Sequence, residues 1–227
     1  MRSVSVFEQE ETLSRKLIAF AIVGMLSLLL CASAAAATLY TTLGPNGEYD
    51  TANGYFVDGS NYFNQVLAFP FIPNATATMA DAVLAMGNYA GGNSPVSAYL
   101  ASDNGGQPGT IMATLTQQGT IPPFTSGGGL VQFNCNGCGT VNAGTTYWII
   151  AQETDPGTEQ AWMFAYQDQT GNGAFNQLGS NSGPWNLFNS TITGYRVDSG
   201  VPEPGTFLML GSGVLAAAAG LRRKLGL

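Results

Sequence analysis

Short apolar and aromatic runs recur through the middle of the chain, separated by clusters of glycine, asparagine, proline and aspartate. Runs rich in Tyr, Phe, Val, Ile and Thr with such boundaries are typical of β-strands. No helical period of useful length follows the N-terminal region. The pattern predicts strands at residues 38–43, 54–58, 64–71, 78–87, 95–102, 110–117, 129–134, 145–153, 161–167 and 191–198. About ten strands in one domain indicate an all-β fold, a jelly-roll-like β-sandwich of two packed sheets.

One segment allows a second interpretation, because Ala82–Met86 could form a helical turn instead of part of a strand. The glycine-rich segments 88–93, 126–129 and 171–183 are interpreted as turns within one domain. We therefore expect a single β-sandwich over residues 38–200, a length that buries roughly 70% of the unfolded surface.

The first 37 residues have the pattern of an export signal. Arg15-Lys16 precede an apolar run at 17–30, and small residues at 32–37 suit cleavage by signal peptidase just after Ala37. Cys31 raises the alternative of a lipoprotein, but Leu30 stands where a lipobox has a small side chain. Residues 1–37 are accordingly predicted to be a cleaved signal peptide with a helical apolar part.

The last 27 residues combine two prolines, an uncharged run and a basic end. Pro202 and Pro204 favour extended backbone outside the helix that follows. The run 206–221 spans roughly 24 Å as a helix, somewhat short of a hydrocarbon core of about 30 Å. The basic residues 222–224 are expected to stay cytoplasmic. We predict a transmembrane helix at 206–221, the alternative being a buried C-terminal helix of the globular domain.

This tail resembles the PEP-CTERM sorting domain of Gram-negative bacteria over residues 201–224. The resemblance implies recognition by exosortase, a membrane-embedded cysteine transpeptidase, in systems that accompany exopolysaccharide and biofilm production. The recognised residues would be the sorting motif Val201, Pro202, Glu203 and Pro204. The implied route is export, an inner-membrane intermediate, and then the cell surface or extracellular matrix.

The middle of the chain resembles the choice-of-anchor R type of bacterial surface domain. The residues that carry this resemblance are Val96–Leu100, the turn 103–109, the strand 110–115 and the segment Ala143–Trp148. The resemblance implies a surface-displayed β domain and brings no active site with it.

Charge and composition exclude several functions. Residues 38–200 contain ten acids and one base, Arg196, for a net charge of −9. A nucleic-acid partner is excluded, because phosphate binding needs a cationic surface. The chain has no histidine, and residues 38–200 have no lysine. Ser-His-Asp triads, Cys-His pairs and lysine Schiff bases are therefore impossible there, and we expect no enzyme.

Carboxylates are the remaining groups for acid–base chemistry. Glu153, Asp155 and Glu159 cluster around a Pro-Gly turn. A glycosidase needs two carboxyl groups about 5 to 9.5 Å apart across a sugar cleft. We favour a solvated polar turn for this cluster and keep a glycosidase as the weakest alternative.

Metal and cysteine chemistry is limited in the same way. No cofactor or transition-metal site is expected, but structural calcium at Asp103-Asn104 or at 50–53 is an alternative to Asx-type turns. Cys135 and Cys138 form a CxxC sequence in a glycine-rich loop. In an exported chain this spacing favours a local disulfide over a redox site.

Aromatic side chains are the best candidates for ligand contact. Alternation along 161–167 places Trp162, Phe164 and Tyr166 on one face, which is either core or a platform for sugar stacking. Trp148 and Trp185 are further candidates, and Trp185 follows a Gly-Pro turn that favours exposure. The sequence thus predicts a non-enzymatic surface or matrix protein, with a carbohydrate-binding sandwich as the alternative.

Overall fold

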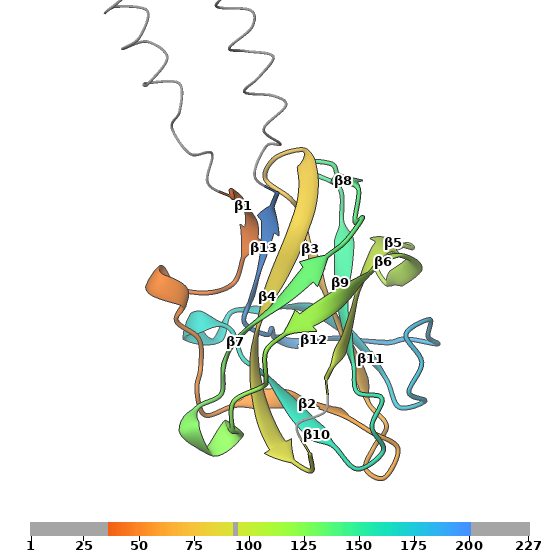
Figure 1. The fold of residues 1–227 in the computed structure, drawn as a ribbon. Helices are drawn as coiled ribbons and strands as arrows, with labels where there is room; N and C mark the ends of the chain where they lie inside the picture. Colours follow the sequence, from red (N-terminus) through yellow and green to blue (C-terminus); the bar gives the residue numbers. More distant parts are fainter. Residues whose placement is uncertain (1–35, 93–94, 201–227) are drawn as a thin grey trace, which may run out of the picture. The chain divides into compact units, whose positions relative to one another are not determined.

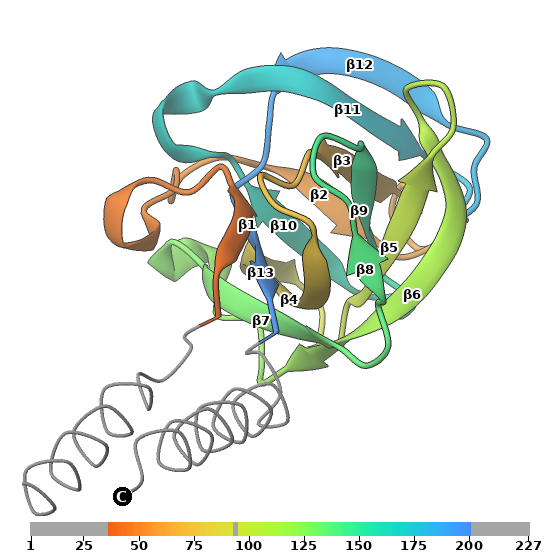
Figure 2. The ribbon, with the colours of Figure 1, turned by 90° about the horizontal axis from the view of Figure 1, so that it is seen from above.

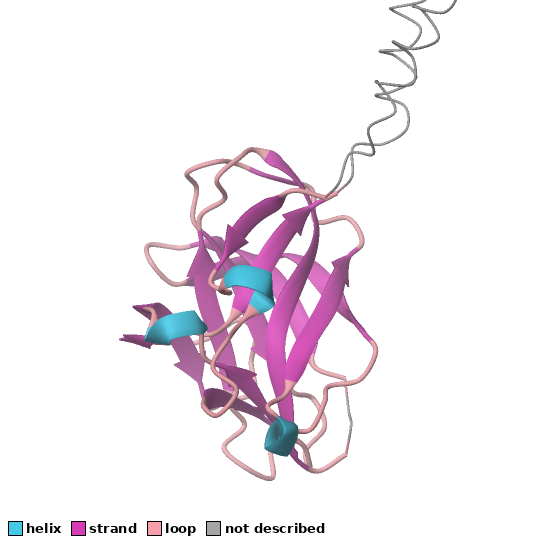
Figure 3. Ribbon diagram, turned by 90° about the vertical axis from the view of Figure 1, so that its left-hand side faces the viewer, coloured by secondary structure: helices cyan, strands magenta, loops and turns pink. Residues whose placement is uncertain are grey.

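The computed structural model describes residues 36–92 and 95–200 (Figure 1). These residues form thirteen strands and three short 3-10 turns, so the all-β prediction is confirmed (Figure 3). The strands are β1 (Thr38–Thr41), β2 (Gly54–Asp58), β3 (Val66–Phe71), β4 (Ala77–Ala90), β5 (Ser97–Asp103), β6 (Pro108–Gln118), β7 (Gly129–Cys135), β8 (Thr140–Val141), β9 (Tyr147–Gln152), β10 (Glu159–Met163), β11 (Thr170–Asn176), β12 (Asn186–Thr191) and β13 (Tyr195–Ser199). The 3-10 turns are η1 (Pro45–Gly47), η2 (Phe124–Ser126) and η3 (Tyr166–Asp168).

The predicted signal segment, apart from Ala36 and Ala37, and the predicted membrane helix at 206–221 lie outside the described residues. Within the described ranges, no helix has the length and apolar character to span a membrane.

One curled antiparallel sheet makes the fold. Its main path runs β1-β13-β4-β7-β6-β5-β9-β3-β11-β12, with β2, β8 and β10 attached beside this path. The long strand β4 pairs with β13, β7, β8 and β10 along its length. Seen from above, the strands surround a common interior (Figure 2). The jelly-roll arrangement of two packed sheets stays a prediction.

Aromatic and branched side chains from distant strands fill this interior. Trp162 on β10 is fully buried and meets Phe69 on β3 edge-on, with ring centroids 5.2 Å apart. It also meets Tyr195 on β13 at 5.7 Å, and its indole N–H donates to the Gly194 carbonyl at 3.2 Å. The Tyr195 hydroxyl donates in turn to the Pro70 carbonyl at 2.6 Å. Burial of such large side chains is the main favourable term in folding.

The prediction of a glycine-rich turn at 171–183 is wrong for the first half of this segment, which belongs to strand β11. Gly173 lies directly opposite Phe188 of β12, and a Cβ at 173 would lie 2.8 Å from Phe188 Cε1. Glycine in this strand therefore makes room for a neighbouring ring. In the sequence, such a glycine cannot be told from one that forms a turn. The strands β8 and β12 were not predicted. The predicted strand 191–198 overlaps β12 only at its last residue, Thr191. Segment 82–86 is part of β4, as the strand interpretation predicted.

The predicted strand 161–167 is also corrected. β10 ends at Met163, and Gln167 and Asp168 in η3 have φ angles of 58° and 49°. Strand alternation thus does not extend to Tyr166. Both faces of β10 are buried, since every residue from Glu159 to Met163 is buried.

Candidate functional site

A polar groove lies between the β5–β6 turn and the segment that leads into β12. Figure 2 shows these two parts of the chain near each other, although they are about 80 residues apart in sequence. The groove is open to solvent and has a volume of about 790 Å³. Its lining residues are Ser102, Asp103, Asn104, Gln107, Pro108, Gly109, Thr110, Ile111, Ser182, Pro184 and Trp185. Hydroxyl and amide groups around one tryptophan are the chemistry of a binding site rather than of a hydrophobic core.

Asp103 organises one wall of the groove. Its Oδ1 accepts a hydrogen bond from the Trp148 indole N–H at 2.8 Å, and its Oδ2 accepts from the Gly106 N–H at 3.1 Å. The Asn104 N–H donates to the Gln107 carbonyl at 2.9 Å and closes the turn. Asp103 is therefore a turn-forming residue that also satisfies a buried indole.

The second segment considered for calcium has a similar structure. Asp50 Oδ1 accepts from the Ala52 N–H at 2.8 Å, and Oδ2 accepts from the Asn53 amide at 2.8 Å. Although burial raises the pKa of Asp50, these hydrogen bonds outweigh it and lower the pKa below its ordinary value. Both segments form Asx-type turns, and the described residues contain no group of three or more acidic or cysteine side chains placed to hold a metal ion.

The three tryptophans occupy different environments. Trp148 is 1% exposed and Trp162 is fully buried, so neither ring has a face that a ligand could reach. This corrects the prediction that Trp148 and Trp162 could stack on a ligand. Trp185 is partly exposed and lines the groove. It remains the one candidate of the three with a ring accessible to a ligand.

The carboxylate cluster is more buried than predicted. Glu153 is 3% exposed, and its Oε1 accepts from the backbone N–H groups of Thr154 and Asp155 at 2.8 and 2.9 Å. Its Oε2 is buried near the Gln160 amide without a well-formed hydrogen bond in the described part of the chain. Glu159 is 7% exposed and lies opposite Asp58 in the β2–β10 ladder. The prediction of a solvated turn is wrong for Glu153 and Glu159, and neither residue lines the polar groove described above.

Burial makes the stability of this domain depend on pH. It raises the pKa values of Asp58, Asp81, Glu153 and Glu159 above their ordinary values. The folded state then holds these protons more tightly than the unfolded chain, so the free energy of unfolding falls as pH rises from about 4 through the raised pKa values. We expect Tm to increase when the pH is lowered from 7 into this window.

Calorimetry of the Glu153→Gln variant tests this expectation, because it removes one of the buried carboxyl groups. Its Tm should change less with pH than that of the unchanged protein. The exposed Glu48 supplies a matched control, since Glu48→Gln removes the same charge at the surface and should leave the slope nearly unchanged. A Tm that falls steadily on acidification from pH 7 would contradict the argument.

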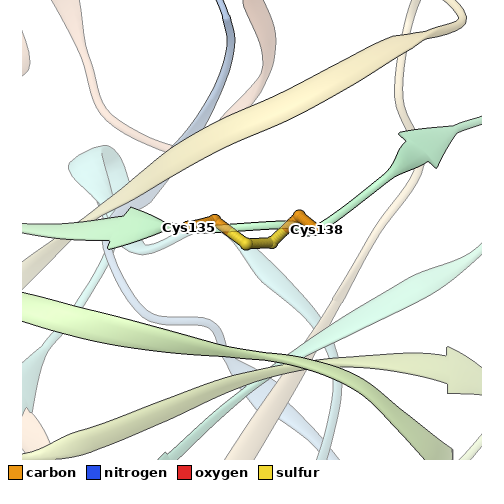
Figure 4. The surroundings of a disulfide bond; sticks show 2 residues. All are labelled: Cys135 and Cys138. Carbon is orange, nitrogen blue, oxygen red and sulfur yellow. A yellow bond between two sulfur atoms is a disulfide. The ribbon is translucent and has the colours of Figure 1, made fainter.

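The predicted disulfide is present between Cys135 and Cys138, whose Cα atoms are 5.6 Å apart (Figure 4). It closes the turn between β7 and β8, and Cys138 packs within the main core. A bridge across three residues removes little chain entropy compared with a long loop. Its structural effect is to fix the chain where it passes from β7 to β8.

The two ends of the described domain lie side by side. The Ala37 N–H donates to Ser199 Oγ at 3.0 Å, and the Ser199 N–H donates to the Ala37 carbonyl at 2.8 Å. Thr38 Oγ1 donates to Asp198 at 2.9 Å, and Arg196 forms an ion pair with the same carboxylate at 2.6 Å. The chain therefore enters the domain through β1 and leaves it through β13 at the same end of the antiparallel pair (Figure 1).

Comparison with known families identifies the segment that follows β13. Residues 200–224 match the PEP-CTERM protein-sorting motif. The predicted sorting motif Val201, Pro202, Glu203 and Pro204 lies inside this match but outside the described residues. Gly200, where the match begins, still donates to the Thr78 carbonyl of β4 at 3.0 Å. No curated protein matches the chain. The motif marks the chain as an exported protein that an exosortase-like system sorts.

Proposed function

We propose that this chain is a non-enzymatic protein of the cell surface or extracellular matrix of a Gram-negative bacterium, associated with exopolysaccharide. Signal peptidase removes residues 1–37, and the helix at 206–221 holds the exported domain at the inner membrane. An exosortase-like transpeptidase then processes the sorting motif. The sorting-motif match at residues 200–224 is the observation that carries this proposal.

The chemistry of the domain supports a role without catalysis. The sequence lacks histidine, and the one basic residue between 38 and 200 is Arg196. That guanidinium is paired with Asp198. Glu153 Oε1 and both oxygens of Asp103 accept local hydrogen bonds that shape turns. The glycosidase alternative therefore gains no support from the geometry of Glu153, Asp155 and Glu159.

The proposal is tested by mass spectrometry of the protein recovered from its native host. We expect a mature N-terminus near Thr38 and a C-terminus cut within or just after the motif, in the surface or matrix fraction. Intact termini on protein from the cytosolic fraction would contradict it. Cleavage after Ala37 would remove the two hydrogen bonds between Ala37 and Ser199 but keep the β1–β13 pairing that begins at Thr38, so the core should be unchanged.

A carbohydrate-binding module is the second candidate function. The groove beside Trp185 favours it, because this groove combines a partly exposed indole with hydroxyl and amide groups.

A further inference from the structure

The charge of the groove restricts what it could bind. Of its lining residues, Asp103 is the one ionisable group and none is basic. Both Asp103 oxygens already accept hydrogen bonds from the protein. Residues 38–200 carry a net charge of −9, which repels anionic polymers. The groove therefore suits an uncharged ligand.

Trp185 supplies a fixed aromatic surface in the groove. It packs against the buried cluster that contains Trp148 and Ala101. Gly183 lies against its edge, since a Cβ at this position would lie 2.8 Å from Trp185 Cδ1. Gly183 also has a φ of 87°, a conformation that favours glycine. The ring is thus held between the cluster and the chain, and its orientation is set before any ligand arrives.

Polar side chains without a hydrogen-bond partner among the described residues line the same groove as this ring. The side-chain amides of Asn104 and Gln107 and the Thr110 hydroxyl line the groove, and they make no hydrogen bond to other described residues. The indole N–H of Trp185 is covered and likewise has no acceptor in the described ranges. A ligand rich in hydroxyl groups would offer both donors and acceptors to the Asn104, Gln107 and Thr110 side chains.

We propose that this groove binds a neutral polysaccharide, with one sugar ring stacked on Trp185 and its hydroxyl groups bound by Asn104, Gln107 and Thr110. The C–H face of a sugar ring is apolar and packs on an indole, while its equatorial hydroxyl groups reach polar side chains at the rim. A cavity of about 790 Å³ falls within the usual range for small-ligand sites. This inference rests on the proposed function as a surface or matrix protein associated with exopolysaccharide. It adds that the polysaccharide is a neutral one.

Binding can be measured with the full-length protein in lipid nanodiscs. The probes are dextran, laminarin and xylan as neutral glycans and alginate as an anionic one. We expect saturable binding to at least one neutral glycan and no binding to alginate. Trp185→Ala should weaken that binding about tenfold or more, whereas Trp185→Phe keeps an aromatic face and should lose much less.

Two further variants separate loss of binding from loss of structure. Thr110→Arg fills the groove without removing a buried contact, so it should also abolish binding while Tm is unchanged. Tyr89→Ala removes an aromatic side chain that is 53% exposed and lies outside the groove, and it should bind as the unchanged protein does.

Three outcomes would overturn the inference: no binding to any neutral glycan, preferential binding to alginate, or neutral-glycan binding that survives both Trp185→Ala and Thr110→Arg. None of these binding results depends on export. The proposed function is contradicted by a different result, which is intact termini on protein from the cytosol of the native host.

Discussion

Replacing Trp162 by alanine is expected to destabilise the domain by about 3–5 kcal/mol, a large fraction of the roughly 5–15 kcal/mol by which folded domains are usually stable. The ring is fully buried between Phe69 and Tyr195, and its N–H is bound to the Gly194 carbonyl. The substitution removes those contacts and leaves a cavity that the surrounding strands fill only in part. Urea unfolding followed by circular dichroism measures the difference.

Trp185→Ala is the matched control for this substitution. The same side chain is removed, but from a partly exposed position at the surface of the groove. We expect a smaller loss, about 1–2 kcal/mol, because the ring packs against the buried cluster on one side but is partly exposed and leaves no closed cavity. Equal losses for the two variants would show that Trp162 is not the centre of the core, and that the comparison of the two tryptophans by burial is wrong.

The tryptophans also show which parts of the site could be predicted from the sequence. The Gly183-Pro184 turn correctly indicated that Trp185 would be the most exposed of the three tryptophans, although it is only partly exposed. Alternation along 161–167 could not decide whether the aromatic face pointed to core or solvent. The structure shows why, because β10 lies between β2 and β4 with both faces covered. A strand that is buried on both faces has no polar face in its sequence, so the pattern does not show which side chains point to the core and which to solvent.

The strands β11 and β12 were hidden for a different reason. β11 contains Gly171 and Gly173, and β12 has mainly polar, exposed residues. Both features resemble loops when the sequence is taken by itself. Gly171 and Gly173 leave room for Ile192 and Phe188, which depends on pairing between strands that local sequence does not encode.

The buried carboxyl groups illustrate the same limit. Glu153 stands beside turn residues, which led to the prediction of a solvated cluster. Its burial arises because Thr158 and Gly59 bring the turn at 155–158 against β2, with the Gly59 N–H donating to the Thr158 carbonyl at 2.9 Å. A Cβ at Gly59 would overlap the Asp155 carbonyl, so glycine permits this close approach. The groove was not predicted either, because its walls come from residues 102–111 and 182–185, which are far apart in the sequence.

Alanine at both Pro202 and Pro204 is expected to abolish processing of the C-terminus in the native host. Proline fixes its own φ and biases the preceding residue toward extended backbone, and we expect this to present the motif to the processing enzyme. Alanine is the strongest helix former and would allow the helix expected at 206–221 to begin earlier in the chain. We expect the intact C-terminus to accumulate in the membrane fraction, as measured by mass spectrometry of that fraction.

Pro45→Ala is the control for this double substitution, because Pro45 is an exposed loop proline far from the tail in sequence. It should be processed normally. Residues 200–224 match the sorting motif, and Gly200 at its start is still hydrogen-bonded to β4. Normal cleavage of the double variant would show that the extended backbone at 202–204 is not what the enzyme recognises.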